Sequence, residues 1–236
     1  MRNLYYVPII HSSADMASLE AALEKTAMAE LGSEIWLRHQ QVVTGFWKSI
    51  RHFFDSFDVR GSRLYQDAMI ADGDTGMKIV TEGVREGSPN YEIVSTLLEK
   101  GAVLTRTEDV YWVKREYNLI AAIASAKSPL ARRIAALRYK LAGNTLLNER
   151  DRIIAGRINE TLRDGEKGIL FLGAYHDILS KLPPDFEINQ VKEVGKIREF
   201  NRILFKAKDK ERWNELAEYL MSPVQVQKYT AATKTL

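Results

Sequence analysis

Short apolar runs alternate with helical patterns along this chain, and that alternation limits the folds open to it. Two runs, 4–10 and 168–172, are almost continuously apolar, as expected for strands buried on both faces of a parallel sheet. Shorter runs at 63–69, 102–107 and 186–191 predict three more strands, with helices between them. We therefore predict an α/β fold with a central, mainly parallel sheet flanked by helices.

Helical periodicity accounts for most of the remaining sequence. Apolar spacing predicts helices over 16–31, 34–57 and 90–100, and one or two helices over 194–220. The segment 110–163 is almost wholly helical in pattern, with breaks at Ser128-Pro129 and near Gly143-Asn144. We interpret it as a helical insertion between strands three and four of a single domain that spans 1–221.

Two further segments are predicted to lack regular structure. The stretch 71–76 is rich in Asp and Gly, but Gly83 stands where an EF-hand loop has its glutamate, so we predict a turn there and no cation-binding loop. The segment 222–236 has no periodic apolar pattern and is predicted to be a flexible tail.

Composition excludes several classes of function. The 236 residues include no cysteine, which excludes disulfides, thiolate metal ligands and a cysteine nucleophile. No apolar leader and no run of ~18 apolar residues is present, so we expect a cytoplasmic protein without a membrane partner. A net charge of +3 is too small to indicate a nucleic-acid partner. Dinucleotide, P-loop and Gly-x-Ser-x-Gly fingerprints are also absent.

Four polar residues stand at the ends of predicted strands. His11 follows the first strand, Asp67 ends the second, Glu108 follows the third and His176 follows the fourth. Ligands of an open α/β sheet bind outside the carboxyl ends of its strands, so we predict that these side chains share one site. Each also has a structural interpretation, because a histidine after a strand is often a packing residue and an acid there often caps a helix.

The chemistry of this residue set leaves two uses open. An imidazole beside carboxylates can titrate near neutral pH and take a proton from water. His11 and His176, with one or two carboxylates, also form a ligand set suited to zinc, manganese or iron. Because 8–10 supply no ligand beside His11, we expect any divalent metal to be weakly held.

The order of these motifs resembles the erythromycin-esterase/ChaN/TraB superfamily. The resemblance rests on the first strand with His11, on the block 148–158 that contains Glu149-Arg150, and on the strand followed by Gly-Ala-Tyr-His at 173–176. It implies an α/β sheet with its site at the strand ends, in a family whose members hydrolyse a macrolide ester, cleave peptides with a metal, or handle haem or iron. It also implies that His11, His176 and Glu149 correspond to the family's two histidines and its acid.

The leading hypothesis for function is a hydrolase that acts on a small molecule or a peptide. His11 would be the general base that activates water, and His176 would orient or polarise the scissile group. Asp67, Glu108 and Glu149 would tune the imidazoles. The alternatives are a non-catalytic protein that binds a metal, haem or another ligand with the same residues, or a partner-binding protein whose site has decayed.

Two helical stretches suggest surfaces for partners. In the helix 34–57, one face carries Trp36 and Trp47 and another carries aromatic residues at spacings of seven and four, namely Phe46, Phe53 and Phe57. Because one helix face can pack on the sheet while the second needs another cover, we predict a homodimer or a lid, with the dimer favoured. In 130–140, we interpret the cations as lying largely opposite the apolar Leu130, Ile134 and Leu137. These cations are Arg132, Arg133 and Lys140, with Arg138 near them. They form either a solvated face or a binding surface for an anion.

Overall fold

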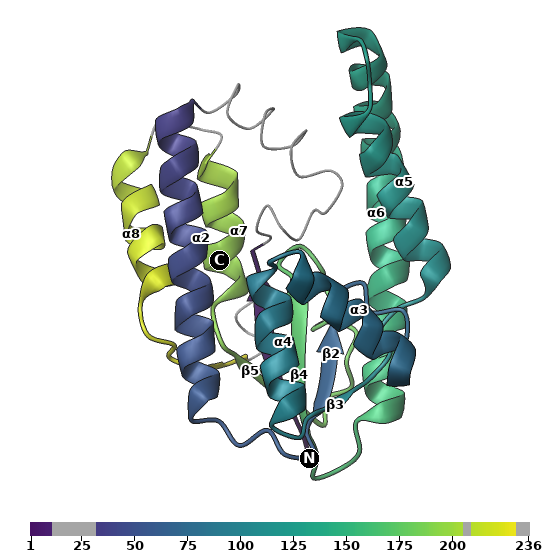
Figure 1. Ribbon diagram of the computed structural model, residues 1–236, viewed down its shortest axis with the longest axis vertical. Helices are drawn as coiled ribbons and strands as arrows, with labels where there is room; N and C mark the ends of the chain where they lie inside the picture. Colours follow the sequence, from purple (N-terminus) through teal and green to yellow (C-terminus); the bar gives the residue numbers. More distant parts are fainter. Residues whose placement is uncertain (11–31, 205–208, 230–236) are drawn as a thin grey trace.

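The computed structural model describes residues 1–10, 32–204 and 209–229 (Figure 1). Within them, a six-stranded sheet has the order β3-β2-β4-β1-β5-β6. Its strands are β1 (Arg2–Ile9), β2 (Arg63–Gln66), β3 (Val103–Leu104), β4 (Lys167–Gly173), β5 (Phe186–Gln190) and β6 (Gln227–Lys228). All neighbouring strands are parallel except β5 and β6, which are antiparallel. The predicted α/β fold with a mainly parallel sheet is confirmed.

The two longest apolar runs form the centre of the sheet. β1 and β4 pair in parallel from Asn3 opposite Lys167 to Ile9 opposite Gly173. Side chains along a strand point alternately to the two faces, yet 169–172 of β4 are all fully buried. The sheet is therefore covered on both faces at its centre, which explains why these runs do not alternate between apolar and polar residues.

Seven described helices surround the sheet: α2 (Ser33–Asp55), α3 (Gly73–Arg85), α4 (Pro89–Glu99), α5 (Val110–Ala124), α6 (Pro129–Thr161), α7 (Val194–Leu204) and α8 (Lys210–Met221). Figure 1 shows α2, α7 and α8 grouped on one side and the α5–α6 hairpin on the other. The hairpin is the predicted helical insertion between β3 and β4. Within the described part of the chain, no helix is long and apolar enough to cross a bilayer.

The aromatic helix α2 packs within its own chain. Phe46 and Trp47 are buried, and the indole N–H of Trp47 donates to the carbonyl of Ile10 at 3.2 Å. Trp36 stacks on His39, which stacks in turn on a phenylalanine of α7, with ring centroids 5.5 and 5.7 Å apart. Rings of α2 therefore have partners within their own chain, and the homodimer stays a prediction.

The structure corrects three local predictions. The turn over 71–76 is the start of α3, where a Cβ on Gly76 would lie 2.7 Å from the carbonyl oxygen of Ala71, so glycine is needed for close approach. The break near Gly143-Asn144 is wrong, because α6 runs through it to Thr161 and the missing side chain costs only about 1 kcal/mol. The tail prediction over 222–236 is wrong at 227–228, which extend the sheet as β6.

The break at Ser128-Pro129 is confirmed as a helix start. The Ser128 hydroxyl accepts a hydrogen bond from the backbone N–H of Ala131 at 3.2 Å, and Pro129 occupies the first turn, where it removes no helical hydrogen bond. The hairpin therefore turns back on itself at this point. The C-terminal half of α6 then packs on the core through Ile154 and Ile158.

Candidate functional site

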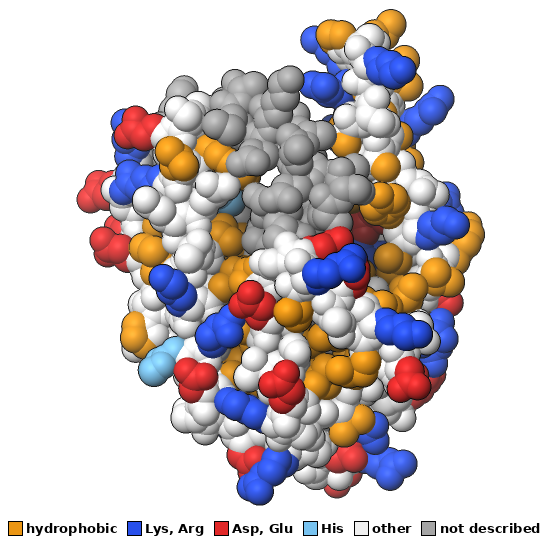
Figure 2. Space-filling model, in the orientation of Figure 1, with side chains coloured by type: hydrophobic (Ala, Val, Ile, Leu, Met, Phe, Trp, Pro, Cys, Tyr) orange, Lys and Arg blue, Asp and Glu red, His pale blue; other side chains and the backbone are white. Residues whose placement is uncertain are grey.

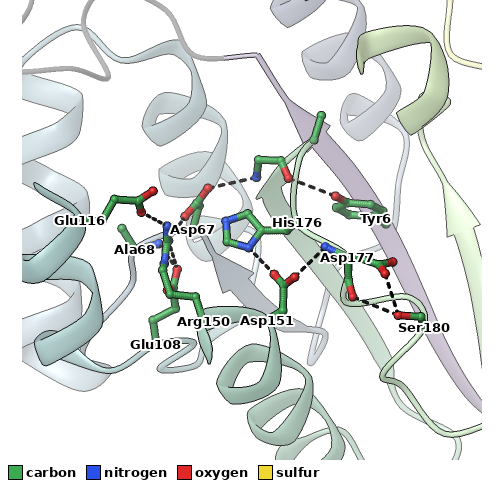
Figure 3. A network of polar contacts seen from close by, with 12 residues as sticks. Tyr6, Asp67, Ala68, Glu108, Glu116, Arg150, Asp151, His176, Asp177 and Ser180 are labelled. Atoms are coloured by element: carbon green, nitrogen blue, oxygen red, sulfur yellow. Dashed lines mark hydrogen bonds and ion pairs between the residues drawn. The ribbon is translucent and has the colours of Figure 1, made fainter. Parts of the chain in front are cut away.

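The ends of β1, β2 and β4 lie side by side at one edge of the sheet. Ile9 at the end of β1 pairs with Gly173 at the end of β4. Asp67 directly follows β2, and its Oδ2 accepts a hydrogen bond from the backbone N–H of Gly173 at 3.0 Å. A carboxylate is thus fixed between two strand ends, at the edge where open α/β sheets bind ligands (Figure 3).

Arg150 of α6 lies at the centre of a buried charge cluster. Its Nε donates to Glu108 Oε2 at 2.5 Å, and its Nη2 donates to Glu108 Oε1 and to Asp67 Oδ1, each at 2.6 Å. Its Nη1 donates to Glu116 of α5. One guanidinium therefore joins carboxylates that follow β2 and β3 to the α5–α6 hairpin, and its fork-like geometry suits such multiple contacts.

The pKa values of Glu108 and Arg150 are both raised. Burial raises the pKa of Glu108, whose side chain is almost fully enclosed, although the hydrogen bonds from Arg150 oppose the rise. Burial alone would lower the pKa of Arg150, but the charges of Asp67, Glu108 and Glu116 outweigh it and raise that pKa. The guanidinium thus stays charged, and the cluster is held together by its cation.

The turn after β2 has an unusual backbone. Ala68 has a φ of 58°, the one left-handed conformation found at a non-glycine residue in the described ranges. Its N–H donates to Glu108 Oε1 at 2.7 Å. Such a conformation costs an alanine of order 1 kcal/mol and persists where surrounding contacts impose it. Here the contact with Glu108 holds the turn that presents Asp67.

His176 is paired with Asp151, a residue of α6. The distance from His176 Nδ1 to Asp151 Oδ1 is 2.5 Å, and both side chains are buried. The second oxygen of Asp151 accepts the backbone N–H of Asp177 at 2.9 Å. Because a carboxylate accepts hydrogen bonds, we assign a proton to Nδ1. Figure 3 shows the imidazole between Asp151 and Asp67.

The pKa of His176 is raised above its ordinary value. Burial lowers it, but the hydrogen bond to Asp151 and the charge of Asp67 raise it by more, while Arg150 opposes them. The imidazole is therefore kept in its cationic form to a higher pH than a free histidine. A buried imidazolium oriented by one carboxylate can donate a proton or polarise a carbonyl group.

Arg198 of α7 holds the loop that carries the histidine. Its Nε donates to the carbonyl of Ala174 at 2.5 Å, and its Nη2 donates to the carbonyl of His176 at 3.1 Å. The backbone N–H of His176 donates to the carbonyl of Gly173 at 3.1 Å, which closes a turn directly after β4. These hydrogen bonds fix the backbone that carries the imidazole.

The structure brings together three of the five predicted site residues: Asp67, Glu108 and His176. Glu149 lies outside the cluster, and its carboxylate pairs instead with Arg152 at 3.1 Å. His11 lies outside the described residues. Neither Asp67 nor Glu108 caps a helix. Asp109 does so, because its Oδ1 accepts the N–H of Tyr111 at 2.8 Å.

Sequence reasoning missed the buried polar residues on the helices. Arg150 and Asp151 fall in the same helical phase as the buried Leu146, Ile154 and Ile158, whereas Glu149 does not. Charged residues in the apolar phase of a helix signal a buried polar site, and this signal distinguishes them from their neighbour. Nothing in the pattern of α5 singles out Glu116.

The described residues contain no group of three histidines and acids placed to hold a metal ion. The carboxylates of Asp67 and Glu108 face the guanidinium of Arg150, which stands where a bound cation would otherwise neutralise them. Comparison of the chain with protein-family models, with curated proteins and with solved structures finds no match.

Proposed function

We propose that this protein is a hydrolase of small-molecule or peptide substrates and that His176 is its acid–base group. One observation carries the proposal. The imidazole of His176 is buried, bonded to Asp151 at 2.5 Å, and held with a raised pKa at the carboxyl ends of parallel strands. Orientation by a carboxylate and a shifted pKa are features of catalytic histidines.

In this proposal, protonated His176 polarises the carbonyl of the scissile ester or amide, and Asp151 stabilises the imidazolium. His11 acts as the general base that takes a proton from water. Asp67 raises the pKa of His176 and fixes the loop through the N–H of Gly173. The resemblance to the erythromycin-esterase/ChaN/TraB superfamily stays a proposal and rests on the motif order alone.

The test compares the wild-type chain with His176→Asn on a panel of chromogenic esters, lactones and short peptides. The Asn side-chain amide can still donate to Asp151 from near the place of Nδ1, but it removes Nε2 and the titratable proton. We expect the wild type to hydrolyse one of these classes and the variant to lose about 100-fold or more in kcat/KM. The expected pH profile falls as pH rises through the raised pKa of His176.

A matched control distinguishes loss of catalysis from loss of structure. Asp177→Asn changes a neighbouring acid whose backbone, and not its side chain, contacts Asp151, so activity should persist. Unfolding curves for both variants should show that the folded state is retained. If no substrate class is hydrolysed, or if His176→Asn keeps wild-type activity, the proposal is wrong.

A further inference from the structure

The projecting part of the α5–α6 hairpin has a surface unlike the rest of the molecule. We call residues 117–148 the arm. The arm contains no Asp or Glu and carries five cations, more than the net charge of +3 of the whole chain: Lys127, Arg132, Arg133, Arg138 and Lys140. None of these side chains forms an ion pair with a described residue. Figure 2 shows blue and orange side chains together on the projecting end.

Four large apolar side chains are exposed along the arm in α6. They are Leu130, Ile134, Leu137 and Leu141, with exposed fractions of 69%, 46%, 57% and 74%. Their spacings of four, three and four residues match the a and d positions of a coiled-coil heptad. We call this stripe the apolar seam. It lies away from α5, since the buried Ala135 and Leu146 occupy the other side of the helix.

The cations flank the apolar seam. With Leu137 at a d position, Arg133 and Lys140 occupy successive g positions and Arg138 occupies an e position. The earlier interpretation of these cations as opposite the apolar residues is therefore wrong for three of the four, and holds only for Arg132. The seam is apolar in the middle and basic on both edges.

We propose that the apolar seam docks an acidic amphipathic helix of a partner protein as a short coiled coil. Residues at e and g form the interhelical ion pairs that determine partner choice, so basic residues there favour a partner with Glu or Asp at the same positions. The seam from Leu130 to Leu141 is about 16 Å long, about one and a half heptads, and supplies four successive a and d positions. This inference is independent of the proposed hydrolysis.

Charge excludes a second copy of the chain as the natural occupant. In a parallel pair, Arg133 of one copy would face Arg138 of the other, and in an antiparallel pair it would face Lys140. A bilayer fits less well than a helix, because the seam is a narrow stripe without aromatic residues, whereas interfacial helices present a broad apolar face with aromatic anchors.

The experiment uses the full chain and two fluorescein-labelled synthetic peptides of three heptads, both with Leu at a and d. One peptide has Glu at every e and g position, and the other has Lys there. By fluorescence anisotropy at low salt, we expect the Glu peptide to bind at least about tenfold more tightly than the Lys peptide, with the difference shrinking at high salt.

Variants of the arm test the apolar seam and its flanking cations separately. Ile134→Asp with Leu137→Asp should abolish binding of the Glu peptide. Arg133→Glu, Arg138→Glu and Lys140→Glu together should reverse the preference and select the Lys peptide. Met77→Asp on α3, which replaces an exposed apolar residue of similar size elsewhere, is the control and should bind as the wild type does. All variants should keep the wild-type melting temperature, because the altered side chains are exposed.

Several outcomes would contradict the proposal. Equal affinity for the two peptides, or failure to bind either, removes the acidic helix as occupant. A concentration-dependent dimer that Leu137→Asp converts to a monomer assigns the seam to a second copy. Binding to vesicles of anionic phospholipid, lost in the same variant and without peptide binding, assigns it to a membrane surface.

Discussion

The strand-end cluster and the arm use charge in opposite ways, although α6 runs through both. In the cluster, Arg150 is buried and contacts three carboxylates. On the arm, Arg138 is exposed and unpaired within the described structure, as are the arm's other cations. Buried charges must be neutralised by the fold itself, whereas exposed ones cost nothing when left for a partner. The same helix therefore stabilises a site at one end and presents a surface at the other.

Arg150→Met is expected to have the largest effect on stability. It removes the cation that Asp67 and Glu108 share and leaves both carboxylates buried without it, which costs about 3 to 5 kcal/mol. Arg138→Met on the arm is the matched control, and we expect a change within about 0.5 kcal/mol. Urea unfolding at neutral pH measures both. Similar losses of stability in the two variants would contradict the difference between the buried cluster and the exposed arm.

Asp151→Asn is expected to destabilise the fold by a smaller, pH-dependent amount. The raised pKa of His176 means that its charge contributes stability that is fully present below the unfolded pKa of about 6.5 and is lost as pH rises through the folded pKa. The difference between wild type and variant should therefore be larger at pH 6 than at pH 9, by about 1 kcal/mol or more. A difference that grows with pH would show that the histidine is neutral in the fold.

Ala68→Gly is expected to change stability by less than about 1 kcal/mol. Glycine relieves the left-handed conformation, but it also gives the unfolded chain more freedom, and the two effects nearly cancel. Chemical denaturation is the measurement. Ala68→Val should instead lose more than about 1 kcal/mol, because a β-branched residue is strained at this φ. Equal behaviour of the two variants would mean that the turn is not held in this conformation.

Divalent metal is expected to have the smallest effect. Because Arg150 already neutralises the strand-end carboxylates, protein purified without chelator should hold less than one transition metal ion per chain. Elemental analysis tests this directly. Finding one tightly held metal per chain would favour the alternative in which His11 and His176 are ligands.

The central fold could be predicted because its signals are local. The runs at 4–10 and 168–172 are apolar without alternation, which indicates strands covered on both faces. Edges were harder. β3 is only two residues long instead of the six expected, because the length of an edge strand depends on tertiary contacts that local periodicity does not carry. The one or two helices predicted over 194–220 are two, α7 and α8.

The site was predictable at the strand ends and much less so on the helices. Asp67, Glu108 and His176 each follow a strand, so strand positions located them. Arg150 and Glu116 meet only because α5 and α6 fold back over the sheet edge. A contact between residues 34 positions apart on separate helices depends on how those helices pack, and sequence spacing alone does not encode it.

The most direct test of the account is the pKa of His176 in solution. Its imidazole resonance, assigned by comparison with His176→Asn, should titrate in a two-dimensional NMR pH series of the wild type. We predict a pKa above the ordinary value of about 6.5, and a lower pKa in Asp151→Asn, where the charged partner is gone. A wild-type pKa at or below the ordinary value, or one that Asp151→Asn leaves unchanged, would contradict the assignment of this pair as the acid–base centre.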